Sequence, residues 1–357
     1  MKKTPEKDVT SFAKLKVGLS PEKILVIRLH AVGDAALTMP ACSSLRKRFP
    51  AAEIDFLTIK NIKGLISAFN IFDCVYFPES GFDFIETGYE SLSQKFLRFK
   101  SVFKIGLVLR KKKYDAVIDL QNNRYSRIIR KLTGAKCFSE FDRYEAKPHS
   151  ERVLDAFSLA GFKGVQNDFN LNISAGAIQK GEKILNDNGW VLDKKLIMLN
   201  PAGLYETRMW GDENYQQLGM LLIKAGYMLL LAGTEKMKKK AAEYKDQFGN
   251  NLIDITGKTA LEDIPGILFH TSGIVSDDSG LFHISWAMGK PGVLLLGATR
   301  ADWTCQPGLH TICLNSSDLE CGNCMKEICK WGDTRCLKRY EPRDVYSKLM
   351  ELMTRKN

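Results

Sequence analysis

Short apolar runs alternate with amphipathic stretches along the first half of the chain. Lys23–Leu29 and Tyr114–Leu120 are rich in branched residues, which is typical of strands buried in a parallel sheet. Glu53–Thr58 predicts a third strand, whereas Ala35–Phe49 and Tyr125–Thr133 have the spacing of helices. Because strands and helices alternate, the pattern predicts an open parallel sheet with helices on both faces.

The same alternation starts again after a polar stretch near residues 167–176. Helices are predicted over Ala177–Asn188 and Glu213–Ala225, and strands over Leu196–Leu199, Tyr227–Leu231 and Gly292–Leu296. The second half is therefore also predicted to be a doubly wound α/β domain.

These two patterns define the expected domains. We expect a first domain over residues 1–172 and a second over residues 173–340, with a cysteine-rich segment at 305–336. A C-terminal helix over 341–357 could pack back on the first domain. Ligands bind at the carboxyl ends of the strands in such sheets, so two facing domains would share a cleft there.

Composition limits the classes of partner and the compartment. The chain has 357 residues and a net charge of +11, which favours anionic partners. Nucleic acid is not expected, because the sequence lacks zinc-finger spacing, an aromatic-glycine RNA-binding motif and an arginine-rich tail. Met1–Lys16 has no apolar core of a signal peptide, and no apolar run approaches the ~20 residues of a membrane span. We therefore expect a cytoplasmic protein.

One basic segment, Gly81–Lys113, leaves two interpretations open. Apolar residues recur in it at helical spacing, and lysines and arginines lie between and after them: Leu92, Phe96, Phe99, Phe103 and Leu107, then Lys95, Arg98, Lys100, Lys104 and Arg110–Lys113. The favoured interpretation is a surface helix whose apolar stripe packs on the sheet. The other is a basic amphipathic helix on an anionic membrane, which would give peripheral contact with the inner face of the inner membrane.

A Gly-Asp pair follows the first predicted strand, in the segment Ile27–Pro40 (IRLHAVGDAALTMP). Gly33 allows a tight turn and close approach of a ligand, and it places the Asp34 carboxylate at the carboxyl edge of the sheet. There an aspartate can accept a proton from a sugar hydroxyl. It can equally cap the following helix, and on this segment alone the cap is slightly favoured.

A second polar turn lies in Val275–Pro291 (VSDDSGLFHISWAMGKP). Ser279 and Gly280 stand at a predicted helix N-terminus, where backbone N–H groups and the helix dipole favour phosphate. Asp278 precedes them, and His283 follows one turn into the helix. In a third segment, Asn200–Trp210, Arg208 follows Thr207 and could neutralise a leaving diphosphate.

Together these segments resemble glycosyltransferase family 9, the ADP-heptose:lipopolysaccharide heptosyltransferases. The turn Val32–Asp34 with Thr38–Pro40 is similar to the family's opening motif, and Ser276–His283 with Ala287–Pro291 is similar to its donor motif. YDAVIDLQ, LTGAK, ITGKTALEDIP and Leu231–Glu235 also match. The resemblance runs from about Ile24 to Val345.

The resemblance implies a GT-B architecture, an α/β fold of two facing Rossmann-like domains with a cleft between them. It implies an inverting, metal-independent transfer of heptose from ADP-heptose to a lipopolysaccharide core or related anionic, lipid-linked glycan. Asp34 would be the catalytic base, with Gly33 and His30 at the acceptor turn. The donor would be held by a group of residues in the second domain: Thr207, Arg208, Glu235, Asp278, Ser279, Gly280 and His283. Arg208 replaces a lysine usual in the family, Asp277 an asparagine and Leu281 a proline.

The sequence leaves other functions open. They are a different nucleotide-sugar donor, a protein acceptor, or a non-catalytic protein that binds nucleotide sugars.

The cysteine-rich segment contains Cys321, Cys324, Cys329 and Cys336, spaced C-x2-C-x4-C-x6-C. Four thiolates could hold a structural zinc or iron ion, and C-x-x-C is a good half-site. The second pair is spaced too widely for a standard zinc knuckle or ribbon. Disulfides are disfavoured inside cells, so we favour reduced packing cysteines or a redox-labile loop, and expect no required cofactor.

Overall fold

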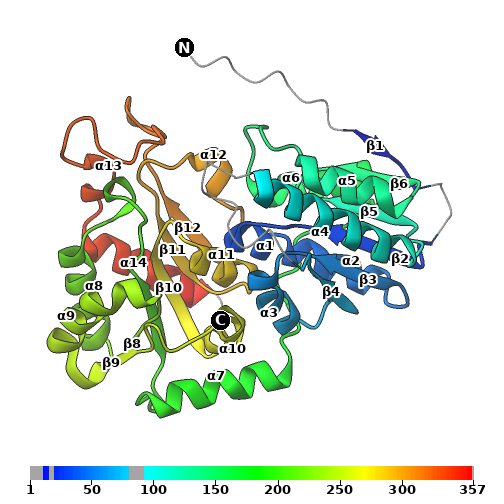
Figure 1. Cartoon of the computed structure of the whole chain (residues 1–357). Helices are drawn as coiled ribbons and strands as arrows, with labels where there is room; N and C mark the ends of the chain where they lie inside the picture. The colour runs from blue at the N-terminus through cyan, green and yellow to red at the C-terminus, as the bar shows by residue number, and fades with distance from the viewer. Residues whose placement is uncertain (1–10, 16–19, 80–91, 356–357) are drawn as a thin grey trace. The chain divides into compact units, whose positions relative to one another are not determined.

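The computed structural model describes residues 11–15, 20–79 and 92–355 (Figure 1). Residues 1–10 and 16 of the N-terminal segment, and residues 81–91 of the basic segment, lie outside these ranges. The chain divides into two compact units, Met1–Asn172 and Ile173–Asn357.

The first unit contains a six-stranded sheet in the order β1-β6-β5-β2-β3-β4. Its neighbouring strands are parallel except for the antiparallel pair of β1 and β6. The strands are β1 Phe12–Ala13, β2 Lys23–Ile27, β3 Glu53–Leu57, β4 Cys74–Tyr76, β5 Ala116–Asp119 and β6 Cys137–Glu140. The helices are α1 Val32–Ala36, α2 Met39–Arg48, α3 Lys60–Ala68, α4 Leu92–Arg110, α5 Arg124–Thr133 and α6 His149–Leu159.

The helix predicted over Ala35–Phe49 consists of two helices. The first, α1, ends at Ala36, and Pro40 is the second residue of α2. Proline has no N–H to donate, so it is tolerated in the first turn of a helix and not in the interior of one. The break therefore leaves a short separate helix, α1, directly after the central strand β2.

The orientation of α4 differs from the favoured prediction. Its buried residues are Arg98, Ser101, Val102, Ile105, Gly106 and Leu109. The predicted stripe is exposed at Leu92, Phe96, Phe103 and Leu107. The helix packs closely on α5 through Gly106, where a Cβ would stand 2.5 Å from Leu132 Cδ1. The glycine, and not the aromatic residues, therefore sets which face is buried.

The second unit contains a six-stranded parallel sheet in the order β12-β11-β10-β7-β8-β9. The strands are β7 Leu196–Asn200, β8 Met228–Leu231, β9 Leu252–Asp254, β10 Thr271–Asp277, β11 Gly292–Leu295 and β12 Thr311–Leu314. The α-helices are α7 Ala175–Asp187, α8 Asp212–Lys224, α9 Lys238–Phe248, α10 Ile264–Phe269, α11 Gly280–Ala287, α12 Ala301–Thr304, α13 Arg335–Lys338 and α14 Pro342–Arg355. Short 3-10 turns lie at Glu206–Arg208, Glu235–Met237, Gly249–Asn251 and Leu261–Asp263.

The C-terminal helix α14 belongs to the second unit. It packs on α8, β10 and β11, and Val345, Leu349 and Leu352 lie in the hydrophobic core of that unit. The apolar face of this helix is therefore used in its own unit. Among the described residues, no helix has the length and apolar character to cross a membrane.

Candidate functional site

Asp34 lies in the first turn of α1, directly beyond the carboxyl end of β2. Its Oδ2 accepts a long hydrogen bond of 3.4 Å from the N–H of Ala31, so the carboxylate does contribute to capping the helix. The same oxygen pairs with the Arg28 guanidinium, and His149 Nδ1 stands 3.6 Å from Oδ1. The Asp34 side chain is 40% exposed. A ligand can therefore reach a carboxylate that two cationic or ionisable groups hold in place.

Arg28 is fixed independently of Asp34. It is 6% exposed, donates to the carbonyl of Leu120, and lies 5.5 Å from the centroid of the Phe141 ring. Arg152 lies 5.0 Å from the same ring and donates to the carbonyls of Asp142 and Arg143, each at 3.1 Å. A buried Phe141 thus orders two guanidinium groups near Asp34.

His30 occupies the loop between β2 and α1. The Gln121 side-chain oxygen accepts from the N–H groups of Leu29 and His30, at 3.0 and 3.1 Å, and Gln121 Nε2 lies 3.3 Å from His30 Nε2. Burial, together with the charge of Arg28, lowers the pKa of His30 to about 4. The imidazole is therefore neutral near pH 7, with Nε2 as a hydrogen-bond acceptor from Gln121.

In the second unit, Ser279 caps the N-terminus of α11. Its Oγ accepts from the N–H of Phe282 at 3.5 Å and also from the side-chain amide of Asn200. Asn200, at the end of β7, in turn donates to Ser276 Oγ at 2.8 Å. Two adjacent strands thus hold the turn that carries Gly280, and the N-terminus of an eight-residue helix suits an anionic group.

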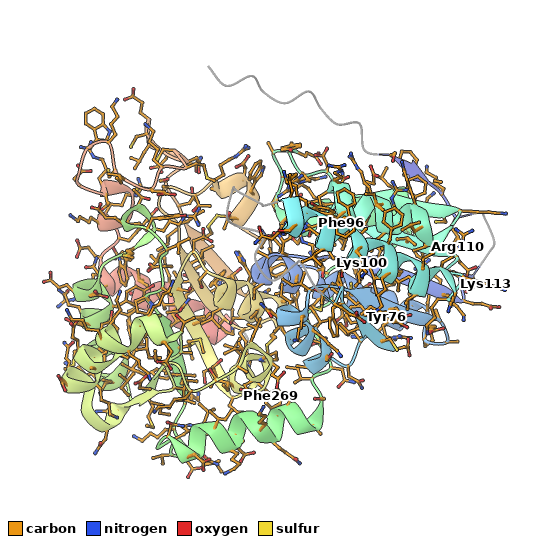
Figure 2. All side chains as sticks on the ribbon, in the orientation of Figure 1. Tyr76, Phe96, Lys100, Arg110, Lys113 and Phe269 are labelled. Carbon is orange, nitrogen blue, oxygen red and sulfur yellow. A yellow bond between two sulfur atoms is a disulfide. The ribbon has the colours of Figure 1, made fainter. Side chains whose placement is uncertain are left out.

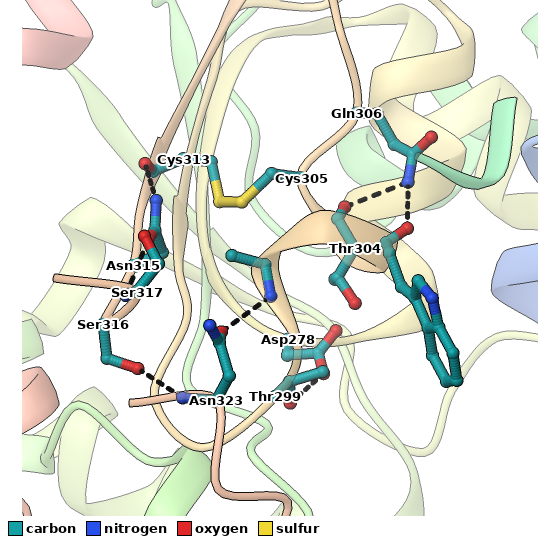
Figure 3. The surroundings of a disulfide bond; sticks show 12 residues. Asp278, Thr299, Thr304, Cys305, Gln306, Cys313, Asn315, Ser316, Ser317 and Asn323 are labelled. Carbon is teal, nitrogen blue, oxygen red and sulfur yellow. Dashed lines mark hydrogen bonds between the residues drawn. A yellow bond between two sulfur atoms is a disulfide. The ribbon is translucent and has the colours of Figure 1, made fainter. Parts of the chain in front are cut away.

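Asp278 connects the Arg208 guanidinium with the His283 imidazole, both predicted for this site. Its carboxylate lies 3.4 Å from Arg208 and 3.8 Å from His283 Nε2, and it accepts from Thr299 Oγ1 at 2.8 Å (Figure 3 shows the Thr299 contact). Burial raises the pKa of Asp278, but the nearby His283, the hydrogen bond from Thr299 and the charge of Arg208 outweigh it, so that its pKa lies below the usual value. The structure therefore brings Arg208, Asp278 and His283 together.

Two other donor residues predicted from the sequence, Thr207 and Glu235, make contacts of their own and do not touch the Asp278 carboxylate in the contacts described. Thr207 is 2% exposed, and its hydroxyl donates to the carbonyl of Lys326 at 2.6 Å, so it is used to anchor the cysteine-rich segment. The Glu235 side chain is exposed, pairs with Lys238 at 2.7 Å, and follows β8, two strands away from Asp278 in the sheet. The Thr207 hydroxyl is thus already bonded within the chain, Glu235 is separate from the Asp278 cluster, and the role of both residues in donor binding stays a prediction.

Asp277 faces the core and not the turn. Its carboxylate accepts from the backbone N–H groups of Gly203 and Trp210, at 3.2 and 3.1 Å, and from the Tyr215 hydroxyl at 3.2 Å. Burial raises the pKa of Asp277 to about 7 despite these hydrogen bonds. The residue therefore holds the loop that carries Arg208.

Cys305 and Cys313 of the cysteine-rich segment form a disulfide, against the expectation that disulfides are disfavoured (Figure 3). The four cysteines expected to be reduced are free in this structure. The four cysteines proposed as metal ligands, Cys321, Cys324, Cys329 and Cys336, line one cavity of about 450 Å³. However, in the described part of the chain no three potential metal-ligating side chains are grouped closely enough to hold an ion. The metal site therefore stays a prediction, carried by the four thiols that line this cavity.

Several residues of the two sites were missed in the sequence. Arg28 and Thr299 each follow or end a buried strand, and the rule that ligands bind at the carboxyl ends of strands could have found them. His149 and Arg152 lie on α6, far along the chain from Asp34, and nothing in their local sequence links them to it.

The chain is similar to known proteins in family, sequence and structure. The model of glycosyltransferase family 9 (heptosyltransferase) matches residues 102–334. Lipopolysaccharide heptosyltransferase 2 of Escherichia coli is 25% identical over 308 residues, which cover 79% of this chain and 84% of that protein.

Solved structures give the same fold. The family 9 glycosyltransferase of Veillonella parvula superposes with a TM-score of 0.75 at 19% identity, over 94% of this chain and 97% of that one. E. coli heptosyltransferase WaaC with ADP-2-deoxy-2-fluoro heptose gives 0.66 at 18% identity, over 92% and 99%. The α/β architecture, with two Rossmann-like domains built on parallel sheets, is the GT-B fold. The chain therefore belongs to glycosyltransferase family 9 and is an enzyme of that family.

Proposed function

We propose that this enzyme is an inverting, metal-independent glycosyltransferase that moves heptose from ADP-heptose to a lipopolysaccharide core or related glycan on the cytoplasmic side of the membrane. The observation that carries the proposal is the Asp34 carboxylate, accessible to a ligand yet paired with Arg28. The names of the relatives supply the sugar and the class of acceptor.

In the proposed reaction, Asp34 accepts the proton of an acceptor hydroxyl. The oxygen forms a bond to the anomeric carbon of the heptose from the face opposite the diphosphate. The bond between that carbon and the diphosphate oxygen breaks, and ADP leaves with the electron pair. One displacement of this kind inverts the anomeric configuration. A pairing with Arg28 favours the ionised form of the carboxylate, which a base requires.

The departing diphosphate gains negative charge, which the second unit is built to stabilise. The α11 N-terminus at Gly280 offers backbone N–H groups, and Arg208 offers a guanidinium oriented by Asp278. His283 supplies a third polar group at the same carboxylate. Fixed donors of this kind stabilise developing charge without a metal ion.

The acceptor in this proposal is anionic, such as a phosphorylated or acidic glycan. Arg28 and Arg152 are ordered by one aromatic ring near Asp34, and the charges of Arg98 and Arg143 also act on His30. Guanidinium groups recognise phosphate and carboxylate well. His30 is neutral here, and it contributes a hydrogen-bonding group in place of a charge.

The test is Asp34→Asn, which keeps the size of the side chain and removes the base. We expect the rate of ADP release with ADP-heptose and a lipid-linked acceptor to fall by roughly 100- to 10,000-fold. ADP binding, measured by calorimetry, should stay unchanged. Asp155→Asn is the matched control, because this partly exposed aspartate of the same unit pairs only with Lys147 among the contacts described.

Unchanged turnover in Asp34→Asn would exclude Asp34 as the base. Binding of ADP-heptose without any turnover in the unaltered chain would favour the non-catalytic alternative. A screen with UDP- and GDP-sugars completes the test, since transfer from another donor alone would remove the heptose assignment.

A further inference from the structure

The helix α4 has one face that is fully accounted for by packing inside the first unit. Val102, Ile105 and Leu109 are buried, and Gly106 lets the helix approach Leu132 of α5. On its flank, the Phe99 ring stacks edge-on against Tyr125, with centroids 5.6 Å apart. This face therefore needs no further partner to hold the helix in place.

The opposite face carries a line of large apolar side chains in contact with solvent. Leu92 is 85% exposed, Phe96 70%, Phe103 48% and Leu107 53%. The spacings of four, seven and four residues place these side chains in one row along the helix. At 1.5 Å per residue the row is roughly 22 Å long. Contiguous exposed apolar surface of this kind marks an interaction site.

Basic side chains flank this row. Residues 92–113 contain eight lysines and arginines and no acidic residue. Lys95, Lys100 and Lys104 are exposed, and Lys104 pairs at 2.5 Å with Glu79, in an exposed pair that is worth little in water. Figure 2 labels Phe96 and Lys100 on α4, and Arg110 and Lys113 at its C-terminal end.

We propose that the exposed face of α4 docks on an anionic phospholipid bilayer. Leu92, Phe96, Phe103 and Leu107 enter the boundary between headgroups and acyl chains. Lys95, Lys100 and Lys104 meet the lipid phosphates, and the basic run after the helix adds to this attraction. A helix that combines a row of apolar side chains with flanking lysines lies in the plane of such an interface.

The chemistry of the face argues for lipid over other partners. A nucleic acid would use the positive charge but would leave four large apolar side chains without a matching surface. A second copy of this face would bring two cationic surfaces together, which like-charge repulsion opposes. A bilayer satisfies both features, because it offers phosphate at its surface and hydrocarbon a few ångströms below.

The experiment is flotation of the full chain with vesicles of phosphatidylethanolamine and phosphatidylglycerol, compared with neutral phosphatidylcholine vesicles, without donor or acceptor. We expect binding only to the anionic vesicles. Phe96→Ser with Phe103→Ser should weaken it roughly tenfold or more. Lys100→Gln with Lys104→Gln should weaken it about 30-fold, since each lysine near a charged membrane surface contributes about a factor of five.

The segment Val191–Lys195 of the second unit supplies matched controls, since all five of its residues are exposed. Val191→Ser with Leu192→Ser, and Lys194→Gln with Lys195→Gln, should leave vesicle binding unchanged. All variants should keep the thermal midpoint of the unaltered chain. Because no substrate is present, failure of this test leaves the proposed transfer reaction untouched, and failure of the Asp34 test leaves this one untouched.

Three outcomes would overturn the proposal. The first is no binding by the unaltered chain. The second is loss of binding in the lysine variant only, which would mean adsorption by net charge without insertion. The third is concentration-dependent self-association that the phenylalanine variant abolishes while vesicle binding persists, which would assign the row to a second copy of the chain.

Discussion

Two substitutions at Arg208 can separate the effect of its charge from the effect of its planar geometry. The guanidinium stands 3.4 Å from Asp278 and is proposed to neutralise the leaving diphosphate. Removing the charge in Arg208→Gln should lower kcat roughly 100-fold, in line with the loss of one preorganised donor at developing charge. Arg208→Lys keeps the charge without the planar guanidinium, so its kcat should lie between that of the unaltered chain and that of Arg208→Gln.

ADP release at saturating donor measures both variants. Arg339→Gln is the control, because Arg339 pairs with the exposed Asp318 at 2.7 Å and has no proposed contact with the donor. Equal rates for the glutamine and lysine variants would mean that charge at this position does not matter.

His30 gives a prediction with a defined pH window. Burial and the neighbouring Arg28 charge lower its pKa to about 4, below the ordinary value of 6.5. Between these values the unfolded chain binds the proton and the folded chain does not. The contribution of His30 to the free energy of unfolding is therefore fully present above about pH 6.5 and is lost as the pH falls through 4. Across this window the free energy of unfolding falls by about 3 kcal/mol.

The imidazole C–H resonances in proton NMR check this directly. We expect the His30 resonance, assigned with His30→Gln, to remain in its neutral position at pH 5. The unaltered chain should also lose more unfolding free energy than His30→Gln between pH 7 and pH 4. Titration of His30 near pH 6.5 would contradict the proposed burial.

At the scale of elements, α7 and α10 pack through two facing glycines. A Cβ on Gly181 would stand 2.3 Å from the backbone carbon of Gly266, and a Cβ on Gly266 would stand 1.9 Å from the Ala177 carbonyl oxygen. These contacts involve backbone atoms, which cannot turn aside as a side chain can. Gly181→Ala should therefore destabilise the second unit by about 1–3 kcal/mol.

Gly176 of the same helix is the matched control. A Cβ there meets no atom within 4 Å, so Gly176→Ala should stabilise the helix by up to about 1 kcal/mol. Urea unfolding followed by circular dichroism measures both variants. An unchanged midpoint in Gly181→Ala would show that the two helices can move apart without loss.

The same elements show what the sequence could and could not predict. The buried strands β2, β7 and β11 were predicted from local apolar runs, because each carries its pattern within a few residues. Pro40 indicates the break between α1 and α2, because proline is tolerated in the first turn of a helix and not in its interior. Two apolar rows compete within α4, because Val102, Ile105 and Leu109 also recur at helical spacing. The close approach of Gly106 to Leu132 of another helix favours the second row, and that contact cannot be seen in the local sequence.

The candidate sites also contain residues whose place the local sequence predicts and residues whose role depends on tertiary contacts. Asp34, Asp278 and Ser279 lie at strand ends, so local sequence placed them correctly beyond the strands. Thr207 sits in an equally polar loop, but its hydroxyl is taken by a carbonyl more than a hundred residues away. Which polar group faces a ligand and which ties two segments together is decided by tertiary contacts.

At the scale of the whole molecule, the proposed chemistry is divided between two units with separate cores. The proposed base, Asp34, belongs to the first unit, and the residues proposed to bind the nucleotide belong to the second. The hydrophobic core of the second unit is made of its own residues, including Trp210, Tyr215 and Tyr244 and three residues of α14. Its cluster of Asn200, Ser279 and Asp278 is likewise held by contacts within the unit.

A fragment of Ile173–Asn357 should therefore fold alone and bind ADP, with an affinity within about tenfold of that of the full chain. It should release no ADP from ADP-heptose when acceptor is added, since Asp34 is absent. Calorimetry gives the affinity, and a cooperative thermal transition verifies folding. Arg208→Gln in the fragment is the control and should weaken ADP binding. A folded fragment that does not bind ADP would mean that the second unit alone does not form the nucleotide site.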